Sequence, residues 1–342
     1  MLITKIYTPK ELSEAANELR LGELVAFPTE TVYGLGADAT NEQAVKRVYL
    51  AKGRPSDNPL IVTVCSREMV EEYTGKLPAD AVKLMDEFWP GSLTIILKIK
   101  PDALSKAVTG GLTTAAFRMP ANQVTLELIK EAGVPLVGPS ANSSGKPSPT
   151  TAQHVFHDLE GRIKGVVDDG PTTVGVESTI VDLSAKKPAV LRPGAVTPEE
   201  IAAVLGKEVV SDKHHVGQTE VPKAPGMKYK HYAPDAQVLI VKADQWTDAL
   251  AWASQQKTKV GVMALDENLA KETLPANVEV FSLGKDVSSA SNHLFAGLRY
   301  FDDQVDYILC AGVPEVGLGE AYMNRLQKAA GNVYFSSIKK DN

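Results

Sequence analysis

Short β-rich runs alternate with amphipathic helical stretches along most of this 342-residue chain, and that alternation restricts the fold more than any other feature. Helical spacing of apolar residues predicts helices at residues 42–52, 79–88 and 123–132. Alternation of this kind is typical of an α/β domain with a largely buried sheet, mixed in strand direction. The predicted strands are residues 24–27, 60–64, 93–99, 114–117, 135–137 and 179–183.

Two further helix starts are each marked by a capping-box sequence. Thr8-Pro9-Lys10-Glu11 and Thr197-Pro198-Glu199-Glu200 each place a capping hydroxyl before Pro and a carboxylate at the third helical position. Such a capping box satisfies backbone N–H groups that have no partner inside the helix. We therefore expect a helix to begin at each segment.

The alternation stops between about residues 209 and 235, where no apolar periodicity remains. Structureless segments of this length are uncommon inside compact proteins, and they serve either as functional lids or as spacers. A strand–helix rhythm resumes afterwards and predicts a smaller Rossmann-like α/β domain. The expected organisation is a first domain at 1–208, a linker or lid at 209–235 and a second domain at 236–342.

Composition indicates a mildly acidic globular protein, with 44% hydrophobic residues and a formal net charge of -6. That charge argues against strong stand-alone binding to nucleic acid or to anionic membranes. Cys65 and Cys310 lie in apolar runs and are expected to be buried free thiols. With neither a signal peptide nor a membrane-length apolar run, the expected location is the cytoplasm.

Several common active-site motifs are absent from the sequence. It contains no Walker A motif for a P-loop, and neither His-Glu-x-x-His nor Cys-x-x-Cys for zinc. Gly138-Pro139-Ser140-Ala141-Asn142 differs from a nucleophile elbow because Asn142 replaces the final glycine. Ser140 is therefore interpreted as a binding hydroxyl.

Polar groups instead cluster where predicted elements end. Lys52 and Arg54 follow a predicted helix, and Ser140 and Asn142 follow a predicted strand. Arginine and lysine in such loops suit carboxylates and phosphates, so the two strings predict a pocket for a small, multiply anionic ligand. Segment 28–36, with its two glycines, predicts a turn that needs positive φ.

Seven motifs, in order along residues 5–207, closely resemble the threonylcarbamoyl-AMP synthase family in its longer, two-domain YrdC-like form. They are PTETVYGL (28–35), KGRP (52–55), WPGSLT (89–94), FRMP (117–120), PSANSSG (139–145), ESTI (177–180) and LRPG (191–194). The resemblance implies a YrdC-like twisted mixed-sheet domain before the smaller domain. It also implies a nucleotidyltransferase that makes threonylcarbamoyl-AMP and pyrophosphate from L-threonine, bicarbonate and ATP.

The resemblance further implies partners and a cofactor. A tRNA threonylcarbamoyl transferase would use the product to modify adenosine 37 in tRNAs that read ANN codons. Mg²⁺ is expected with ATP, held mainly by phosphate oxygens and water. The linker would close over the pocket.

Site residues follow from the same resemblance. The implied catalytic residues are Lys52 and Arg54, which would neutralise phosphates. The implied ATP-binding residues are Lys52, Arg54, Asn58, Thr114, Ser140, Asn142, Ser148, Arg192 and Tyr232, and the implied threonine-binding residues are Thr31, Thr63, Arg118 and Ser178. Many family members have His at the position of Asn58, which argues against a general base there.

Two other functions compete with the synthase hypothesis. A non-catalytic RNA-binding module is disfavoured by the acidic net charge and by little interleaving of aromatic and basic residues. A hydrogenase-maturation carbamoyltransferase shares this type of domain but carries zinc fingers, which two cysteines cannot build.

Overall fold

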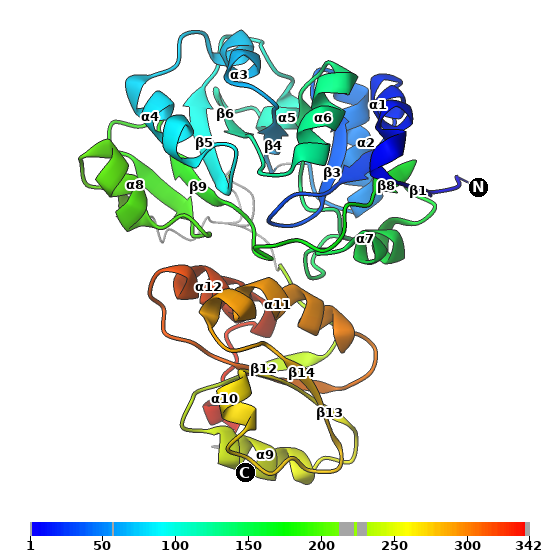
Figure 1. Cartoon of the computed structure of the whole chain (residues 1–342), viewed down its shortest axis with the longest axis vertical. Coiled ribbons are helices and arrows are strands. Elements are labelled where there is room, and N and C mark those ends of the chain that lie inside the picture. Colours follow the sequence, from blue (N-terminus) through cyan, green and yellow to red (C-terminus); the bar gives the residue numbers. More distant parts are fainter. Residues whose placement is uncertain (1, 57, 212–221, 224–230, 339–342) are drawn as a thin grey trace. The chain divides into compact units, whose positions relative to one another are not determined.

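The computed structural model describes residues 2–56, 58–211, 222–223 and 231–338. These residues divide into two compact units. The first comprises Met1–Ser144, Ser148–Thr173 and Glu177–Tyr229, and the second comprises Gly145–Pro147, Val174–Val176 and Lys230–Asn342. Each unit is built around its own sheet (Figure 1).

The first unit contains an eleven-stranded mixed sheet in the order β1-β8-β2-β3-β7-β4-β6-β5-β9-β10-β11. Parallel and antiparallel pairs both occur; for example, β4 runs parallel to β6, and β5 runs antiparallel to β6. The strands are β1 (Lys5–Tyr7), β2 (Val25–Phe27), β3 (Gly34–Asp38), β4 (Ile61–Thr63), β5 (Leu93–Lys98), β6 (Thr114–Arg118), β7 (Leu136–Val137), β8 (Gly165–Val167), β9 (Thr179–Asp182), β10 (Ala189–Arg192) and β11 (Val210–Ser211).

Helices cover one face of this sheet almost completely. Strand residues such as Val62, Ile95 and Phe117 pack there in one core with α2, α4, α7 and α8. The helices of the first unit are α1 (Leu12–Arg20), α2 (Glu42–Lys52), α3 (Arg67–Thr74), α4 (Ala79–Phe88), α5 (Lys106–Thr109), α6 (Gln123–Ala132), α7 (Ala152–Leu159) and α8 (Pro198–Leu205), with a 3-10 turn η1 (Pro9–Glu11) before α1.

The opposite face is only partly covered. Helices α1 and α6 pack over the β2, β7 and β8 end of that face in a second core. Toward β4, β6, β5, β9 and β10 the face carries a small apolar cluster, to which no described helix contributes a residue. Its buried members are Ile61, Ile96, Ala116, Ile180 and Leu191. The candidate site lies on the part of this face on which no described helix packs, named the uncovered face, although the residues of its apolar cluster are buried.

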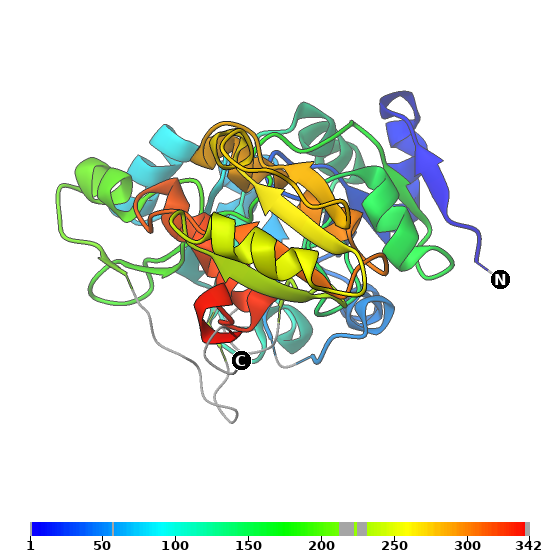
Figure 2. The same cartoon turned by 90° about the horizontal axis from the view of Figure 1, so that it is seen from below.

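The second unit contains a four-stranded parallel sheet in the order β12-β15-β13-β14. Its helices α11 and α12 lie on one side of the sheet and α9 on the other (Figure 1), and Figure 2 shows the unit from the α9 side. The elements are β12 (Gln237–Val241), α9 (Trp246–Ser254), β13 (Val260–Ala264), α10 (Asp266–Leu269), β14 (Val278–Ser282), α11 (Val287–Tyr300), β15 (Tyr307–Ala311), α12 (Leu318–Ala330) and α13 (Phe335–Ile338). The predicted Rossmann-like α/β class is confirmed.

The three helices predicted in the first unit are confirmed at both ends. Two of them have local start and stop signals: Asn41 caps α2, Asn122 caps α6, and left-handed glycines end both helices. Both capping boxes are also present, at Thr8 and at Thr197. Strands β1, β3, β8, β10 and β11 were not predicted, and β11 lies within the segment predicted to be a linker.

The chain bends at residues 30–32 of segment 28–36, but the predicted positive φ is wrong: Gly34 and Gly36 belong to strand β3, and neither has a positive φ. They are required by close packing instead. A Cβ on Gly34 would lie 2.7 Å from Cζ of Phe27, and one on Gly36 would lie 2.5 Å from the carbonyl oxygen of Val25. The Phe27 ring occupies the space that side chains at these positions would need.

The two cysteines differ in environment. Cys310 is fully buried, and burial raises the pKa of its thiol to about 12. Cys65 is only partly buried, so the prediction of two buried thiols is wrong for this residue. Among the described residues, no helix is long and apolar enough to cross a membrane.

We predict that Thr197→Ala lowers the free energy of unfolding by about 1 kcal/mol. Thr197 Oγ1 accepts a hydrogen bond from Glu200 N at 3.2 Å, and this cap begins helix α8, which buries Ile201 and Leu205. Urea unfolding checks the change, and Thr197→Ser, which keeps the hydroxyl, is the matched control. Equal stability of the alanine and serine variants would contradict the prediction.

Candidate functional site

Alternation along the strands places several predicted site residues on the uncovered face of the first sheet. Thr63 and Arg118 are direct partners at the carboxyl ends of the parallel strands β4 and β6. Thr114 lies on the same face of β6 as Arg118, since the two are four residues apart. At about 3.3 Å per residue their Cα atoms lie about 13 Å apart. The face is therefore long enough to hold two small ligands end to end.

Lys52 connects the segment at the end of α2 to the 140–144 loop through hydrogen bonds. Its ammonium group donates to the carbonyl oxygen of Ser140, to the carbonyl oxygen of Asn142 at 2.7 Å and to Asn142 Oδ1 at 3.4 Å. The backbone N–H of Ser144 donates in return to the carbonyl oxygen of Lys52 at 2.8 Å. The structure thus brings Lys52, Ser140 and Asn142 together, and Lys52 holds the 140–144 loop against the end of α2.

Arg118 is bound by three protein groups. Its Nε donates to the carbonyl oxygen of Gly91 at 3.1 Å, and its Nη1 donates to Thr31 Oγ1 at 2.8 Å. Its Nη2 forms an ion pair with Glu30 Oε1 at 2.5 Å, between side chains that are 10% and 8% exposed. Two residues predicted to bind the same ligand, Thr31 and Arg118, are therefore in direct contact.

Glu30 is a site residue that was not among the residues predicted to bind a ligand. Besides Arg118, its Oε1 accepts a hydrogen bond from Ser92 Oγ at 2.9 Å, and its Oε2 accepts one from the backbone N–H of Ala121 at 3.0 Å. Its place in the motif beside Thr31 was the available signal. That signal could not identify the partner, because Arg118 is 88 residues away in sequence.

The Thr31 hydroxyl lies among several hydrogen-bonding groups. Thr29 Oγ1 lies 2.6 Å from the carbonyl oxygen of Val32, which can only accept, so Thr29 donates its hydroxyl proton there. Thr29 Oγ1 in turn accepts from the backbone N–H groups of Thr31 at 3.1 Å and Val32 at 3.2 Å, and it lies 2.9 Å from Thr31 Oγ1. Thr31 Oγ1 accepts from Arg118 and keeps a second lone pair with which it can accept from a ligand.

Ser178 links a second cation to the same face. Arg192 donates from Nε to the carbonyl oxygen of Ser178 at 3.0 Å and from Nη2 to Ser178 Oγ at 3.2 Å. Ser178 Oγ also lies 2.7 Å from Thr94 Oγ1. Ser178 directly precedes strand β9, which runs beside β5, and there Thr179 N donates to the carbonyl oxygen of Ser92 at 3.0 Å. Ser92 thus contacts both the Ser178 segment and Glu30.

Asn58 and Arg54 lie in the loop that follows α2. Asn58 is fully buried, and its side-chain amide has no hydrogen-bond partner among the described residues. Arg54 Nη2 lies 3.4 Å from the carbonyl oxygen of Asn58, and its guanidinium lies 5.9 Å from the Tyr49 ring centroid. Arg54 also lines a surface pocket of about 880 Å³, together with Lys46 and Lys106.

The remaining predicted residues are dispersed. Ser148 Oγ donates to Glu177 Oε1 at 2.6 Å, and both side chains are buried. Tyr232 belongs to the second unit, where its ring lies 5.2 Å from that of Phe295. Its role at a nucleotide stays a prediction. Most of the predicted lid, at 212–221 and 224–230, lies outside the described residues.

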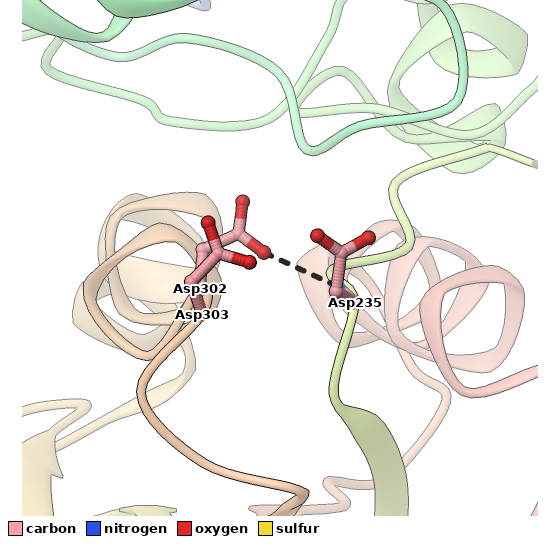
Figure 3. A group of neighbouring side chains, drawn as sticks. All are labelled: Asp235, Asp302 and Asp303. Atoms are coloured by element: carbon pink, nitrogen blue, oxygen red, sulfur yellow. Dashed lines mark hydrogen bonds between the residues drawn. The ribbon is translucent and has the colours of Figure 1, made fainter.

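A cluster of three aspartates is the candidate metal centre within the described part of the chain. Figure 3 shows Asp235, Asp302 and Asp303 with their carboxylates turned toward one another. Lys146 binds this cluster, with Nζ 2.6 Å from Asp235 Oδ2 and 3.3 Å from Asp302 Oδ2. The hydrogen bond from Lys146 lowers the pKa of Asp235. The cluster therefore forms an ion-pair network with a lysine and offers no argument for a metal ion.

Comparisons with known proteins cover both units. A family model described as "Telomere recombination" matches residues 17–194, and one described as "Threonylcarbamoyl-AMP synthase, C-terminal domain" matches residues 196–331. The threonylcarbamoyl-AMP synthase of Bacillus subtilis is 49% identical over 94% of this chain and 93% of its own length. That of Pyrococcus abyssi is 46% identical over 93% of both.

A solved structure is similar over the full length as well. The crystal structure of Pyrococcus abyssi Sua5 complexed with L-threonine matches with a TM-score of 0.89 and 43% identity. The match covers 97% of this chain and 99% of that one.

We predict that Lys52→Met lowers the free energy of unfolding by about 1–3 kcal/mol for each buried carbonyl left without a donor. Lys46→Met is the matched control on the same helix, because Lys46 forms a surface ion pair with Glu42. The control should change stability by less than about 0.5 kcal/mol. Denaturant unfolding measures both, and equal effects would show that Lys52 does not hold the 140–144 loop.

Proposed function

The chain belongs to the threonylcarbamoyl-AMP synthase family, and on that premise we propose how its first unit forms threonylcarbamoyl-AMP and pyrophosphate from L-threonine, bicarbonate and ATP. The observation that carries the proposal is the contact between Arg118 and Thr31 on the uncovered sheet face. A guanidinium beside a small hydroxyl suits a hydroxylated amino acid. Relatives 41–49% identical bear the name of this synthase.

Threonine would bind at the Arg118 end of the face. Arg118 would hold the carboxylate, because a guanidinium matches a carboxylate in geometry and charge. Thr31 can accept a hydrogen bond from the substrate hydroxyl, and Thr63 adjoins Arg118 across the strands. The apolar cluster around Ile61 and Ala116 would pack against the methyl group of threonine.

The nucleotide would bind along the segments that follow α2 and β7. Lys52 and Arg54 would offset phosphate charge, and the Asn58 amide and the Ser140 and Asn142 groups would hold the nucleotide in place. The unpartnered amide of Asn58 supports a ligand there, since buried polar groups without partners are rare. Thr114 and Ser148 complete the proposed ATP set.

Reaction would occur where the two ligands meet, near Ser178 and Arg192. The carboxylate of threonine, the carbamate and the triphosphate repel one another, so fixed cations must offset that repulsion before attack on the α-phosphorus. Arg192 would stabilise charge that develops as pyrophosphate leaves. The enzyme would then act by positioning and electrostatics, without a covalent enzyme intermediate.

Mg²⁺ is part of the proposal. The Ser148 hydroxyl and the Glu177 carboxylate, 2.6 Å apart, are hard oxygen donors of the kind that fits this ion. A single carboxylate fits an ion held mainly by phosphate oxygens and water. When bound with ATP, Mg²⁺ would neutralise triphosphate charge, and the residues Lys52 and Arg54 would complement it.

The proposed product is an activated acyl adenylate, and its consumer would be a tRNA threonylcarbamoyl transferase that modifies adenosine 37 in tRNAs reading ANN codons. The proposed location is the cytoplasm. A non-catalytic RNA-binding role has no observation of its own in the described residues.

Pyrophosphate release from ATP, L-threonine and bicarbonate tests the function. Arg192→Ala should lower kcat about 10²–10³-fold, since it removes a donor that acts on developing charge. Arg118→Ala should instead raise KM for threonine by about 30-fold or more, since it removes a buried charge partner of the ligand. Arg67→Ala, which breaks a surface ion pair with Asp86, is the control.

Wild-type protein that binds tRNA but releases no pyrophosphate would contradict the synthase and support the RNA-binding alternative. Arg192→Ala protein with wild-type turnover would contradict the role given to that residue.

Chelation of divalent cations should stop pyrophosphate release and leave the affinity for L-threonine unchanged, because Mg²⁺ is proposed to act only on the phosphates. Calorimetry with and without EDTA measures threonine binding, and addition of excess Mg²⁺ should restore turnover. Undiminished turnover in EDTA would exclude a required divalent ion.

A further inference from the structure

The buried ion pair between Arg118 and Glu30 gives the amino-acid end of the site both signs of charge. We propose that Glu30 binds the α-ammonium group of the incoming amino acid while Arg118 binds its carboxylate. This inference rests on the proposed function, and it deepens it by assigning the group that distinguishes an amino acid from other carboxylic acids.

The charges of Arg118 and Glu30 favour a zwitterionic ligand. A lone guanidinium on this face would attract any small anion that enters, including bicarbonate, pyrophosphate and the phosphates of ATP. With the Glu30 carboxylate 2.5 Å away, the pair carries no net charge. An arrangement of one cation and one anion complements a zwitterion, whose own two charges lie a few bonds apart.

Arg118 and Glu30 both have hydrogen-bonding capacity left for a ligand. A guanidinium has five N–H donors, and Arg118 uses one each on Nε, Nη1 and Nη2 within the described residues. One donor therefore remains on each Nη atom for a ligand carboxylate. In the described part of the chain, Oε2 of Glu30 accepts only from Ala121 N, so a lone pair remains there for an ammonium group.

The Glu30 side chain is held in place by neighbouring groups. Ser92 Oγ and Ala121 N hold the Glu30 carboxylate, and the carbonyl oxygen of Glu30 accepts from Thr173 N at 3.1 Å. The Glu30 side chain is thus fixed before a ligand arrives, and binding costs little side-chain entropy.

A purely structural Glu30, which only positions Arg118, makes a different prediction. Loss of such a residue would weaken all ligands that bear a carboxylate to the same extent. Loss of an ammonium-binding residue would weaken only those ligands that carry the ammonium group. The comparison of L-threonine with 3-hydroxybutyrate separates the two roles, since the second compound lacks only the amine.

The experiment measures the dissociation constants of both compounds by calorimetry for wild type, Glu30→Gln and Ser92→Ala. Wild type should bind L-threonine at least about tenfold more tightly than 3-hydroxybutyrate, as expected for a buried charge pair. In Glu30→Gln the two constants should agree within about threefold, through weaker threonine binding. Ser92→Ala keeps the carboxylate and should retain most of the preference.

An unchanged preference in Glu30→Gln would overturn the inference. Equal binding of the two compounds by wild type would also overturn it, and this comparison needs no variant and decides the matter if Glu30→Gln does not fold. Wild type that binds neither compound and releases no pyrophosphate would instead refute the proposed function itself, and the inference with it.

Discussion

Alternation of side chains along the central strands of the eleven-stranded sheet is the constraint on which the rest of the first unit depends. Val62 and Phe117 point into the helix-covered core, and their sequence neighbours Thr63 and Arg118 must then point to the opposite face. Because α1 and α6 cover only one end of that face, its other end keeps polar groups over a thin apolar floor. The position of the site follows from where the helices stop.

The cations of the site are already engaged before any ligand is present. Lys52 donates to carbonyl oxygens of the 140–144 loop, Arg118 pairs with Glu30, and Arg192 holds Ser178. Such contacts fix each charge in place and reduce the cost of ordering it when a ligand binds. The pair with Glu30 also neutralises the charge of Arg118, whereas hydrogen bonds to carbonyl oxygens leave Lys52 and Arg192 charged.

Local signals made part of this structure predictable. Helices α2, α4 and α6 were placed to the residue because their amphipathic spacing agreed with their boundaries, and Asn caps and left-handed glycines marked two of them. The roles of Gly34 and Glu30 were not predictable in the same way. Each depends on a partner distant in sequence or across strands, Phe27 for the glycine and Arg118 for the glutamate.

The polarity of α2 sets this site apart from phosphate sites built on helix amino termini. Lys52 is the last residue of α2, Gly53 caps the helix at φ 62°, and Arg54 comes next. A helix dipole presents partial negative charge at that end, whereas phosphate-binding helices present their positive end. If a nucleotide binds here as proposed, the Lys52 and Arg54 side chains must outweigh the negative end of the helix. Replacing both with neutral residues would then turn attraction of phosphate into repulsion by the helix end.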